Sequence, residues 1–404
     1  MHGMTAAGVL GASALVAAMA ACGSTTSPAA IDHDRSASIV EGMAPAAVAT
    51  GDPSGAPASG PEPGSAALEP AAPTVQREPW TFGDAPGFVL VTPNYRLNTT
   101  IVDEPMLREL PLLMEAALRH YASELVRLPM PTHPLRSSIF AKRSEWAAHT
   151  KRRMPRDADT YLAIGRGGYT TDGESALFDI GREDTFTIAL HEGWHQFTQT
   201  VFKDRLPVWL EEGIACWMEG MRFRRESAAP TFMPWRNVER FGELREAARS
   251  GRLVPFAELL KSTPQEALGQ GKGTLLTYYA QVWALVHFLN EGEGGRYRDA
   301  LRQVVADAAA GRLVARLVNS NAIPSEVRHP WLLARGGRWV AIEYLNADLD
   351  ELGAQYDAFV RQIVASGNGQ RVWRGESPTE KPVDRSAEKP VGKSVEGPTA
   401  RSGG

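Results

Sequence analysis

The sequence predicts an α+β fold in which a mixed α/β part comes first and a mainly helical part follows. Short runs rich in β-branched and aromatic residues alternate with helical patterns until about residue 180. After Asp184 the apolar residues recur with a helical period for most of the chain. Bulky apolar residues are sparse in residues 23–77 and 367–404, so the folded part is expected at residues 78–366.

Two strands and two helices are predicted in the first part. Residues 88–92 are a β-rich run that leads into a Pro-Asn turn, and residues 137–140 have the composition of a second strand. Residues 104–128 carry apolar side chains at helical spacing, which indicates an amphipathic helix. A shorter helix is expected at residues 144–153.

A third strand and a series of helices are predicted next. The glycines of residues 165–168 mark a loop, and residues 175–180 have the composition of a strand. A helix is expected to begin at Asp184 and Thr185, which are a good N-cap pair. Further helices are predicted at residues 208–219, 274–290 and 349–364.

Both ends of the chain are expected to lie outside the folded part. Residues 23–77 are rich in Ala, Pro, Gly and Ser, a composition that buries too little apolar surface to offset the entropy of ordering. Residues 367–404 contain an eight-residue near-repeat with Pro in each unit. We therefore expect a disordered tether at the first segment and a disordered tail at the second.

Residues 1–22 have the pattern of a signal peptide. An uncharged run rich in Ala, Gly, Leu, Val and Met ends in Met19-Ala20-Ala21-Cys22. This ending resembles a bacterial lipobox. We therefore expect Cys22 to carry a lipid that anchors the protein to the membrane, outside the cytoplasm, in a bacterial cell envelope. A plain secretory signal is the first alternative. An uncleaved anchor is the second, although the run is short for a membrane span.

Charge and cysteine content limit the classes of function. The 43 basic and 47 acidic side chains nearly balance, and no run of Lys and Arg occurs, so a nucleic-acid partner is not expected. Cys22 and Cys216 are the only two cysteines, which excludes a disulfide framework. We therefore expect a fold held by its apolar core and not by disulfide bridges.

The segment His191-Glu192-Gly193-Trp194-His195 carries the chemistry. On a helix His191 and His195 lie one turn apart on the same face, so both imidazoles can reach one ion. Glu192 is displaced around the helix axis and suits the role of general base toward a metal-activated water. With nine histidines in the chain, this spacing arises by chance about one time in a hundred. Two surface histidines without a ligand are the alternative.

A third ligand is expected on the next helix. Residues 203–207 form a short connection, so the helix at 208–219 is predicted to lie antiparallel to the first one. Glu211 and Glu212 both occur early in it, and spacing alone separates them poorly.

The paired segments resemble the gluzincin metallopeptidases of the peptidase MA clan, in which Trp-Leu-x-Glu-Gly follows His-Glu-x-x-His. The resemblance implies a thermolysin-like zincin core that binds one zinc ion per chain through His191, His195 and Glu212. It also implies that a downstream tyrosine donates to the oxyanion. Tyr279 is the first candidate for this role and Tyr278 the second, and packing of their helix is the alternative.

The resemblance extends to bacterial peptidase-MA-like domains of unknown function, over about residues 80–290. It is carried by Leu-Pro-x-Trp-Leu-x-Glu-Gly-x-Ala at residues 206–215 and by Tyr-Ala-Gln before an apolar run at residues 279–288. It implies that the strand at residues 176–180 forms the cleft edge that pairs with an extended substrate. An ordinary internal strand is the alternative.

These observations predict a zinc-dependent peptidase that acts on peptides or proteins. Aminopeptidase gluzincins use a Gly-x-Met-Glu-Asn segment to hold a free amino terminus. No such segment precedes the His-Glu-x-x-His motif here, so an endopeptidase is expected. The alternatives are a catalytically inactive tethered binding or structural module and a hydrolase of non-peptide amides. Packing is expected for Cys216, and Glu219 is a candidate to orient a ligand histidine. Structural roles are expected for the other histidines of the folded part, which are His120, His133, His149, His287 and His329.

Overall fold

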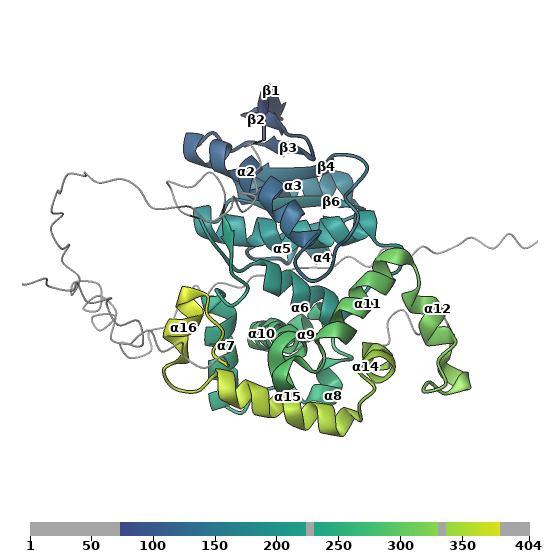
Figure 1. Ribbon diagram of the computed structural model, residues 1–404. Helices are drawn as coiled ribbons and strands as arrows, with labels where there is room; N and C mark the ends of the chain where they lie inside the picture. The colour runs from purple at the N-terminus through teal and green to yellow at the C-terminus, as the bar shows by residue number, and fades with distance from the viewer. Residues whose placement is uncertain (1–72, 224–229, 330–336, 380–404) are drawn as a thin grey trace, which may run out of the picture. The chain divides into compact units, whose positions relative to one another are not determined.

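The computed structural model describes residues 73–223, 230–329 and 337–379 (Figure 1). The predicted signal peptide with Cys22, and most of the predicted tether, lie outside these residues. The described part divides into two compact units. The first takes residues 73–120 and 129–201, and the second takes residues 121–128 and the described residues from 202 onward.

A six-stranded mixed sheet is the centre of the first unit. Its strand order is β1-β2-β3-β4-β6-β5, with parallel pairing of β3 with β4 and of β4 with β6. The pairs β1–β2, β2–β3 and β5–β6 are antiparallel, so a parallel centre is flanked by hairpins. The strands are β1 (Gln76–Phe82), β2 (Ala85–Val91), β3 (Tyr95–Thr99), β4 (Leu135–Phe140), β5 (Gly168–Thr171) and β6 (Glu174–Phe178).

Four helices connect and cover these strands: α2 (Glu104–Tyr121), α3 (Arg143–Arg153), α4 (Ala158–Leu162) and α5 (Arg182–Val201). The prediction for α2 was too long, because the helix ends at Tyr121 and not at Leu128. Leu125 and Leu128 are 6% and 7% exposed, although they follow the helix as turns and coil. The apolar spacing of these two leucines therefore reflects their burial, and it does not mean that the helix continues to Leu128.

Helices α3 and α5 cover opposite faces of the sheet. Successive side chains of a strand point to opposite faces, so Ala176 and Phe178 share one face and Ser175 and Leu177 the other. Trp146 of α3 contacts Phe178 at a ring distance of 5.2 Å and donates from Nε1 to the Ala176 carbonyl. On the other face, α5 contacts β5 and β6.

The edge strand next to α5 is β5, whose first residue was predicted to lie in a loop and whose other residues were not predicted to form a strand. Strand β6 pairs with β4 on one side and with β5 on the other, so the expectation that residues 176–180 form a sheet edge is wrong. Asp172 and Gly173 join β5 to β6 with φ values of 52° and 72°. Two consecutive positive φ values are the pattern of a type I′ hairpin turn, for which Asp-Gly is a preferred sequence.

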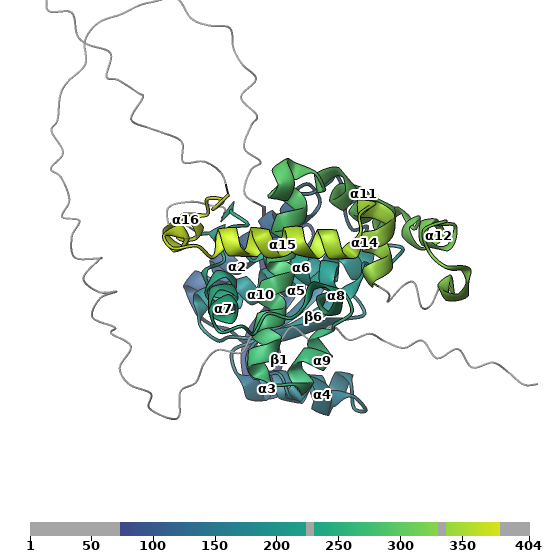
Figure 2. The same ribbon diagram turned by 90° about the horizontal axis from the view of Figure 1, so that it is seen from below.

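The second unit is mainly helical, with one short hairpin of β7 (Met221–Arg222) and β8 (Thr231–Phe232). Its centre is α10, which contacts α6, α7, α9, α11 and α15 and is buried on all sides over most of its length. Figure 2 shows α15 running across this unit, where Tyr356 donates from its hydroxyl to the Gln281 carbonyl at 2.9 Å. The helices are α6 (Val208–Met218), α7 (Val238–Arg249), α8 (Phe256–Leu259), α9 (Pro264–Gly269), α10 (Lys272–Glu291), α11 (Arg298–Ala310), α12 (Leu313–Val318), α14 (Gly337–Leu345), α15 (Leu349–Ile363) and α16 (Asn368–Arg374).

The order of elements confirms an α+β chain with a mixed part followed by a mainly helical one. The helices predicted at residues 208–219, 274–290 and 349–364 are α6, α10 and α15. The predicted tail was drawn too early, because α16 lies beyond Ser366 and buries Val372. Within the described residues, no helix combines the length and the apolar composition that a membrane span requires.

Candidate metal centre

Helix α5 carries the His-Glu-x-x-His motif in the first unit, and it begins two residues before the predicted N-cap. Asp179 Oδ1 accepts from the Gly181 amide at 2.9 Å and from the Thr185 hydroxyl at 3.0 Å. The same hydroxyl accepts from the Ile180 amide at 3.0 Å. Thr185 thus fixes the start of the helix from inside its first turn, whereas Asp184 pairs with Arg166 at the surface. Asp179, which lies before the helix, therefore fixes its start through Gly181 and Thr185, and Asp184 does not act as the N-cap.

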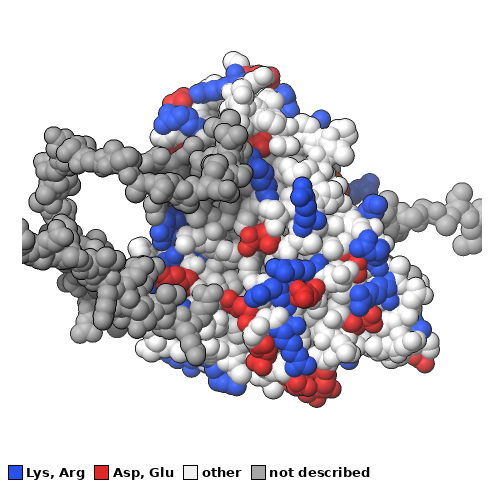
Figure 3. Space-filling model, in the orientation of Figure 1, with Lys and Arg blue, Asp and Glu red and all other residues white. Residues whose placement is uncertain are grey.

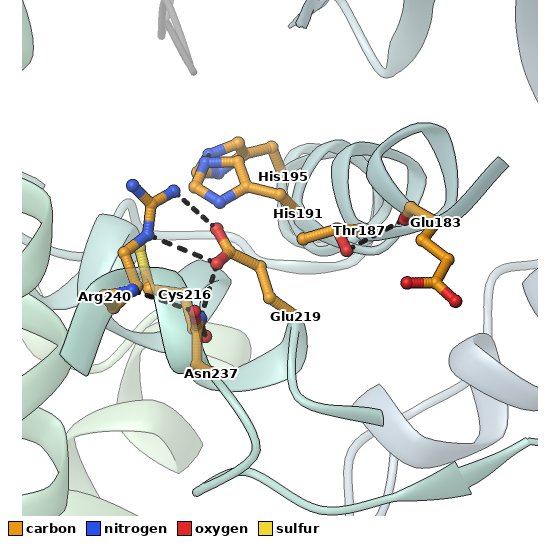
Figure 4. Close-up of polar contacts among 8 residues, drawn as sticks. All are labelled: Glu183, Thr187, His191, His195, Cys216, Glu219, Asn237 and Arg240. Atoms are coloured by element: carbon orange, nitrogen blue, oxygen red, sulfur yellow. Dashed lines mark hydrogen bonds and ion pairs between the residues drawn. The ribbon is translucent and has the colours of Figure 1, made fainter. Parts of the chain in front are cut away.

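His191 and His195 present their imidazoles on the same side of α5 (Figure 4). Their Nε2 atoms lie 3.2 Å apart, and their ring planes make an angle of 79°. The residues are 2% and 0% exposed. Two nitrogen ligands of a tetrahedral zinc ion, with bonds of 2.0–2.1 Å, stand about 3.3 Å apart. The donor atoms and their separation therefore fit a shared zinc ion, and the prediction that α5 brings the two histidines together is confirmed.

Glu192 is fully buried and contacts strand β5. Thr170 of β5 places its hydroxyl 2.7 Å from Glu192 Oε2, with the carboxylate as acceptor. The same hydroxyl lies 3.0 Å from the main-chain carbonyl of Glu192. Thr170 was not predicted from the sequence as a site residue. The Asp-Gly turn was the signal that could have found it, because that turn makes the residues before it a strand paired with β6.

Glu211 and Glu212 lie on α6 in the second unit and differ in environment. Glu212 is 0% exposed and Glu211 is 8% exposed. The next residue, Gly213, faces α10, because a Cβ atom there would stand 2.6 Å from the Val282 carbonyl oxygen. The glycine of the motif thus allows two helix backbones to touch. Neighbouring helix residues point about 100° apart, so Glu212 flanks this contact on one side.

Glu219, just beyond the end of α6, is held by two residues of the second unit (Figure 4). Arg240 donates to its two carboxylate oxygens at 2.9 and 3.2 Å, and Asn237 Nδ2 donates to Oε2 at 2.6 Å. Burial works to lower the pKa of the Arg240 guanidinium, but neighbouring acidic groups, with Glu219 first among them, outweigh burial and leave that pKa well above its ordinary value. Glu219 is therefore the buried partner of an arginine.

Tyr278 and Tyr279 lie on α10 and are both buried. Burial raises the pKa of each hydroxyl well above its ordinary value, and the negative charge of Glu212 raises it further. Both hydroxyls therefore stay protonated at neutral pH and can act as donors. The Tyr279 ring lies under the Arg240 guanidinium at 4.9 Å. Tyr279 also shares a fully buried stripe with Val282, Trp283 and Val286, as the packing alternative predicted.

The remaining histidines do not belong to any group of side chains that could hold a metal ion within the described residues. Cys216 of α6 is buried, as the packing role predicted for it requires. Basic and acidic side chains are interspersed on the face of the molecule shown in Figure 3.

The residues predicted for the site are thus distributed over both units. His191, Glu192 and His195 belong to the first, and Glu212, Tyr278 and Tyr279 to the second. Comparison of the chain with protein families, with characterised proteins and with solved structures finds no match.

Proposed function

We propose that the protein is a zinc-dependent peptidase with a thermolysin-like gluzincin core. The observation that carries the proposal is the pair of buried imidazoles on α5, whose Nε2 atoms lie 3.2 Å apart beside the buried carboxylate of Glu192. Two neutral nitrogen donors next to a carboxylate are what zinc hydrolases use to bind the ion and to move a proton.

Glu212 is proposed as the third ligand, with His191 and His195 as the other two. Glu219 is a rival carboxylate of the second unit, and it is buried as Glu212 is. It is the weaker candidate, because its charge is already balanced by Arg240. Metal binding there would leave a buried guanidinium without its partner, which is costly.

A zinc ion held by these residues would supply a Lewis acid that lowers the pKa of water and polarises a carbonyl group. Glu192 is the group that takes a proton from the attacking water and passes it to the leaving amine. A protonated tyrosine, Tyr279 in the first instance and Tyr278 in the second, donates to the oxygen that becomes negative. The absence of an aminopeptidase-type Gly-x-Met-Glu-Asn segment supports an endopeptidase.

The second candidate is a catalytically inactive tethered module that keeps this fold for binding or structure. One observation favours it. The Thr170 hydroxyl gives the buried carboxylate of Glu192 a partner at 2.7 Å, so Glu192 has a structural contact as well as a chemical role.

The proposed place of action is outside the cytoplasm, in a bacterial cell envelope. The Ala-Ala-Cys ending at Cys22 supports a lipid anchor, and a secreted protein is the alternative. Mass spectrometry of the mature N-terminus from the native host tests the anchor. A start at a residue after Cys22, or an unmodified thiol there, would contradict it.

Replacement of Glu192 tests the enzyme against the inactive module. Glu192→Gln keeps the size of the side chain but cannot accept the proton, so turnover should fall at least about a hundredfold while about one zinc per chain is retained. Proteome-derived peptides, profiled by mass spectrometry with purified protein, measure the turnover. Glu183→Gln is the matched control, since Glu183 is exposed on the same helix and should keep full activity.

Two results would count against the proposal. Protein prepared with zinc present that carries no transition metal would contradict the site. Peptide cleavage that survives Glu192→Gln undiminished would show that another group acts as the base.

A further inference from the structure

We infer that Thr170 is a positioning residue whose hydroxyl holds the carboxylate of Glu192 in the orientation needed for proton transfer. Its effect on turnover rests on the proposed peptidase function. The contact itself lies entirely within the first unit. It joins the edge strand of the sheet to the helix that carries the histidines.

The geometry makes Thr170 a restraint on one particular atom. Its hydroxyl stands 2.7 Å from Glu192 Oε2 and 3.0 Å from the main-chain oxygen of the same residue. Thr170 is 0% exposed, so water does not compete for this hydroxyl. A hydrogen bond to a charged acceptor is about twice as strong as one between neutral groups. The short distance to Oε2 indicates that the carboxylate is the principal acceptor.

Thr170 can restrain Glu192 because the strand is itself attached to α5. Gln196 Nε2 donates to the Gly173 carbonyl at 2.9 Å, and Gln199 Oε1 accepts from the Gly173 amide at 3.1 Å. Gln199 Nε2 also donates to the Thr170 carbonyl at 3.4 Å. Glu192, Gln196 and Gln199 are spaced by four and three residues, so they share one face of α5. All three form hydrogen bonds with the β5–β6 hairpin.

A second set of contacts fixes the neighbouring strands on the same face. Thr170 is the register partner of Ser175 on β6. Ser175 donates to the Ser137 hydroxyl of β4 at 2.8 Å, and Ser137 donates to Gln196 Oε1 at 3.1 Å. The hydroxyl of Thr170 therefore has a position determined by both the sheet and the helix. A base held in this way loses less entropy when it meets its substrate proton.

A double-mutant cycle tests the contact without any measurement of activity. Thr170→Val removes the hydroxyl and keeps the shape, and Glu192→Ala removes the carboxylate. In metal-free protein Thr170→Val should lower the melting temperature by about 3–6 °C, because a hydrogen bond to a charge is lost. In the Glu192→Ala background the same substitution should lower it by less than half as much.

Turnover of peptides is the second measurement. Thr170→Val should lower kcat at least about tenfold and change KM less than about twofold, because binding groups are untouched. Thr170→Ser restores the hydroxyl and should keep kcat within about threefold of the wild type. Thr150→Val is the control. Thr150 is a buried threonine of the same unit, and its hydroxyl donates to the Trp146 carbonyl at 2.8 Å. Loss of this hydroxyl should lower the melting temperature and leave kcat unchanged.

The two measurements separate this inference from the proposed function. Melting shifts that simply add in the double variant would overturn the inference, whatever the activity. Wild-type kcat in Thr170→Val would overturn it as well. If the wild-type protein cleaves no peptide, the proposed function fails, and coupling in the melting cycle would still establish that Thr170 holds Glu192.

Discussion

Arg240 and Glu219 form an ion pair that is withdrawn from solvent on both sides, with side chains 1% and 2% exposed and Nη2 2.9 Å from Oε1. The pair connects α7 to the end of α6. It also occupies the carboxylate that rivals Glu212 as the candidate third ligand of the proposed site. The sequence suggested that Glu219 could orient a ligand histidine, and the described residues give it Arg240 and Asn237 as partners.

Replacement of Arg240 should be strongly destabilising. Arg240→Leu leaves the Glu219 charge buried without its cation, which typically costs about 3–5 kcal/mol in the free energy of unfolding. Arg249→Leu is the matched control, because the Arg249–Glu246 pair is 78% and 48% exposed and such pairs contribute about 0–1 kcal/mol. Urea denaturation of both variants measures the difference. Equal losses in the two variants would contradict the structural role given to Arg240.

Glu212 and Glu211 should differ in their effect on zinc. Glu212→Ala removes the proposed third ligand and should lower zinc affinity by tenfold or more, since even groups that only orient a ligand contribute about 10–100-fold. Glu211→Ala should keep stoichiometric zinc and measurable activity. Titration against a competing chelator measures both affinities. Loss of zinc from Glu211→Ala, with retention by Glu212→Ala, would show that the wrong glutamate has been assigned.

Tyr279 and Tyr278 can be separated by removal of each hydroxyl. If Tyr279 donates to the developing oxyanion, Tyr279→Phe should lower kcat about 10²–10³-fold, and Tyr278→Phe should lower it less than about threefold. The Tyr278 hydroxyl is buried and makes no hydrogen bond within the described residues, which makes Tyr278 the alternative donor. The kcat values of both variants decide between them. If kcat changes little in both variants, the two tyrosines have a packing role and neither donates to the oxyanion.

Much of the fold that positions the histidines could be predicted from the sequence. The helical period after Asp184 placed α5 within two residues, and the spacing of His191 and His195 was enough to bring their imidazoles together. Local rules suffice there, because both histidines belong to one helix. Leu125 shows where local rules fail, because its side chain is buried although its backbone lies beyond the end of α2.

The contacts that orient Glu192 could not be predicted from local sequence patterns. They depend on which strand occupies the edge of the sheet, and the order of strands is set by tertiary contacts. The glycines before residue 169 suggested a loop, although Asp172-Gly173 carried a hairpin signal that makes Thr170 part of a strand. Even with that strand assigned, the strand order β4-β6-β5 is needed to set Thr170 against α5.

His120 should make the stability of the metal-free protein depend on pH. Burial lowers the pKa of its imidazole to about 4, whereas an unfolded histidine titrates near 6.5. Between these values the unfolded chain binds more protons at His120 than the folded chain does, so stability rises with pH. The contribution is therefore present above pH 6.5 and is lost as the pH falls from about 6.5 to about 4, by on the order of 3 kcal/mol in all. His120→Gln cannot titrate and should flatten the curve in this window. Urea midpoints from pH 4 to pH 8, with a chelator present to remove metal, give the difference between the variant and the wild type. Parallel curves for the wild type and His120→Gln would show that the imidazole of His120 is charged in the folded state as readily as in the unfolded one.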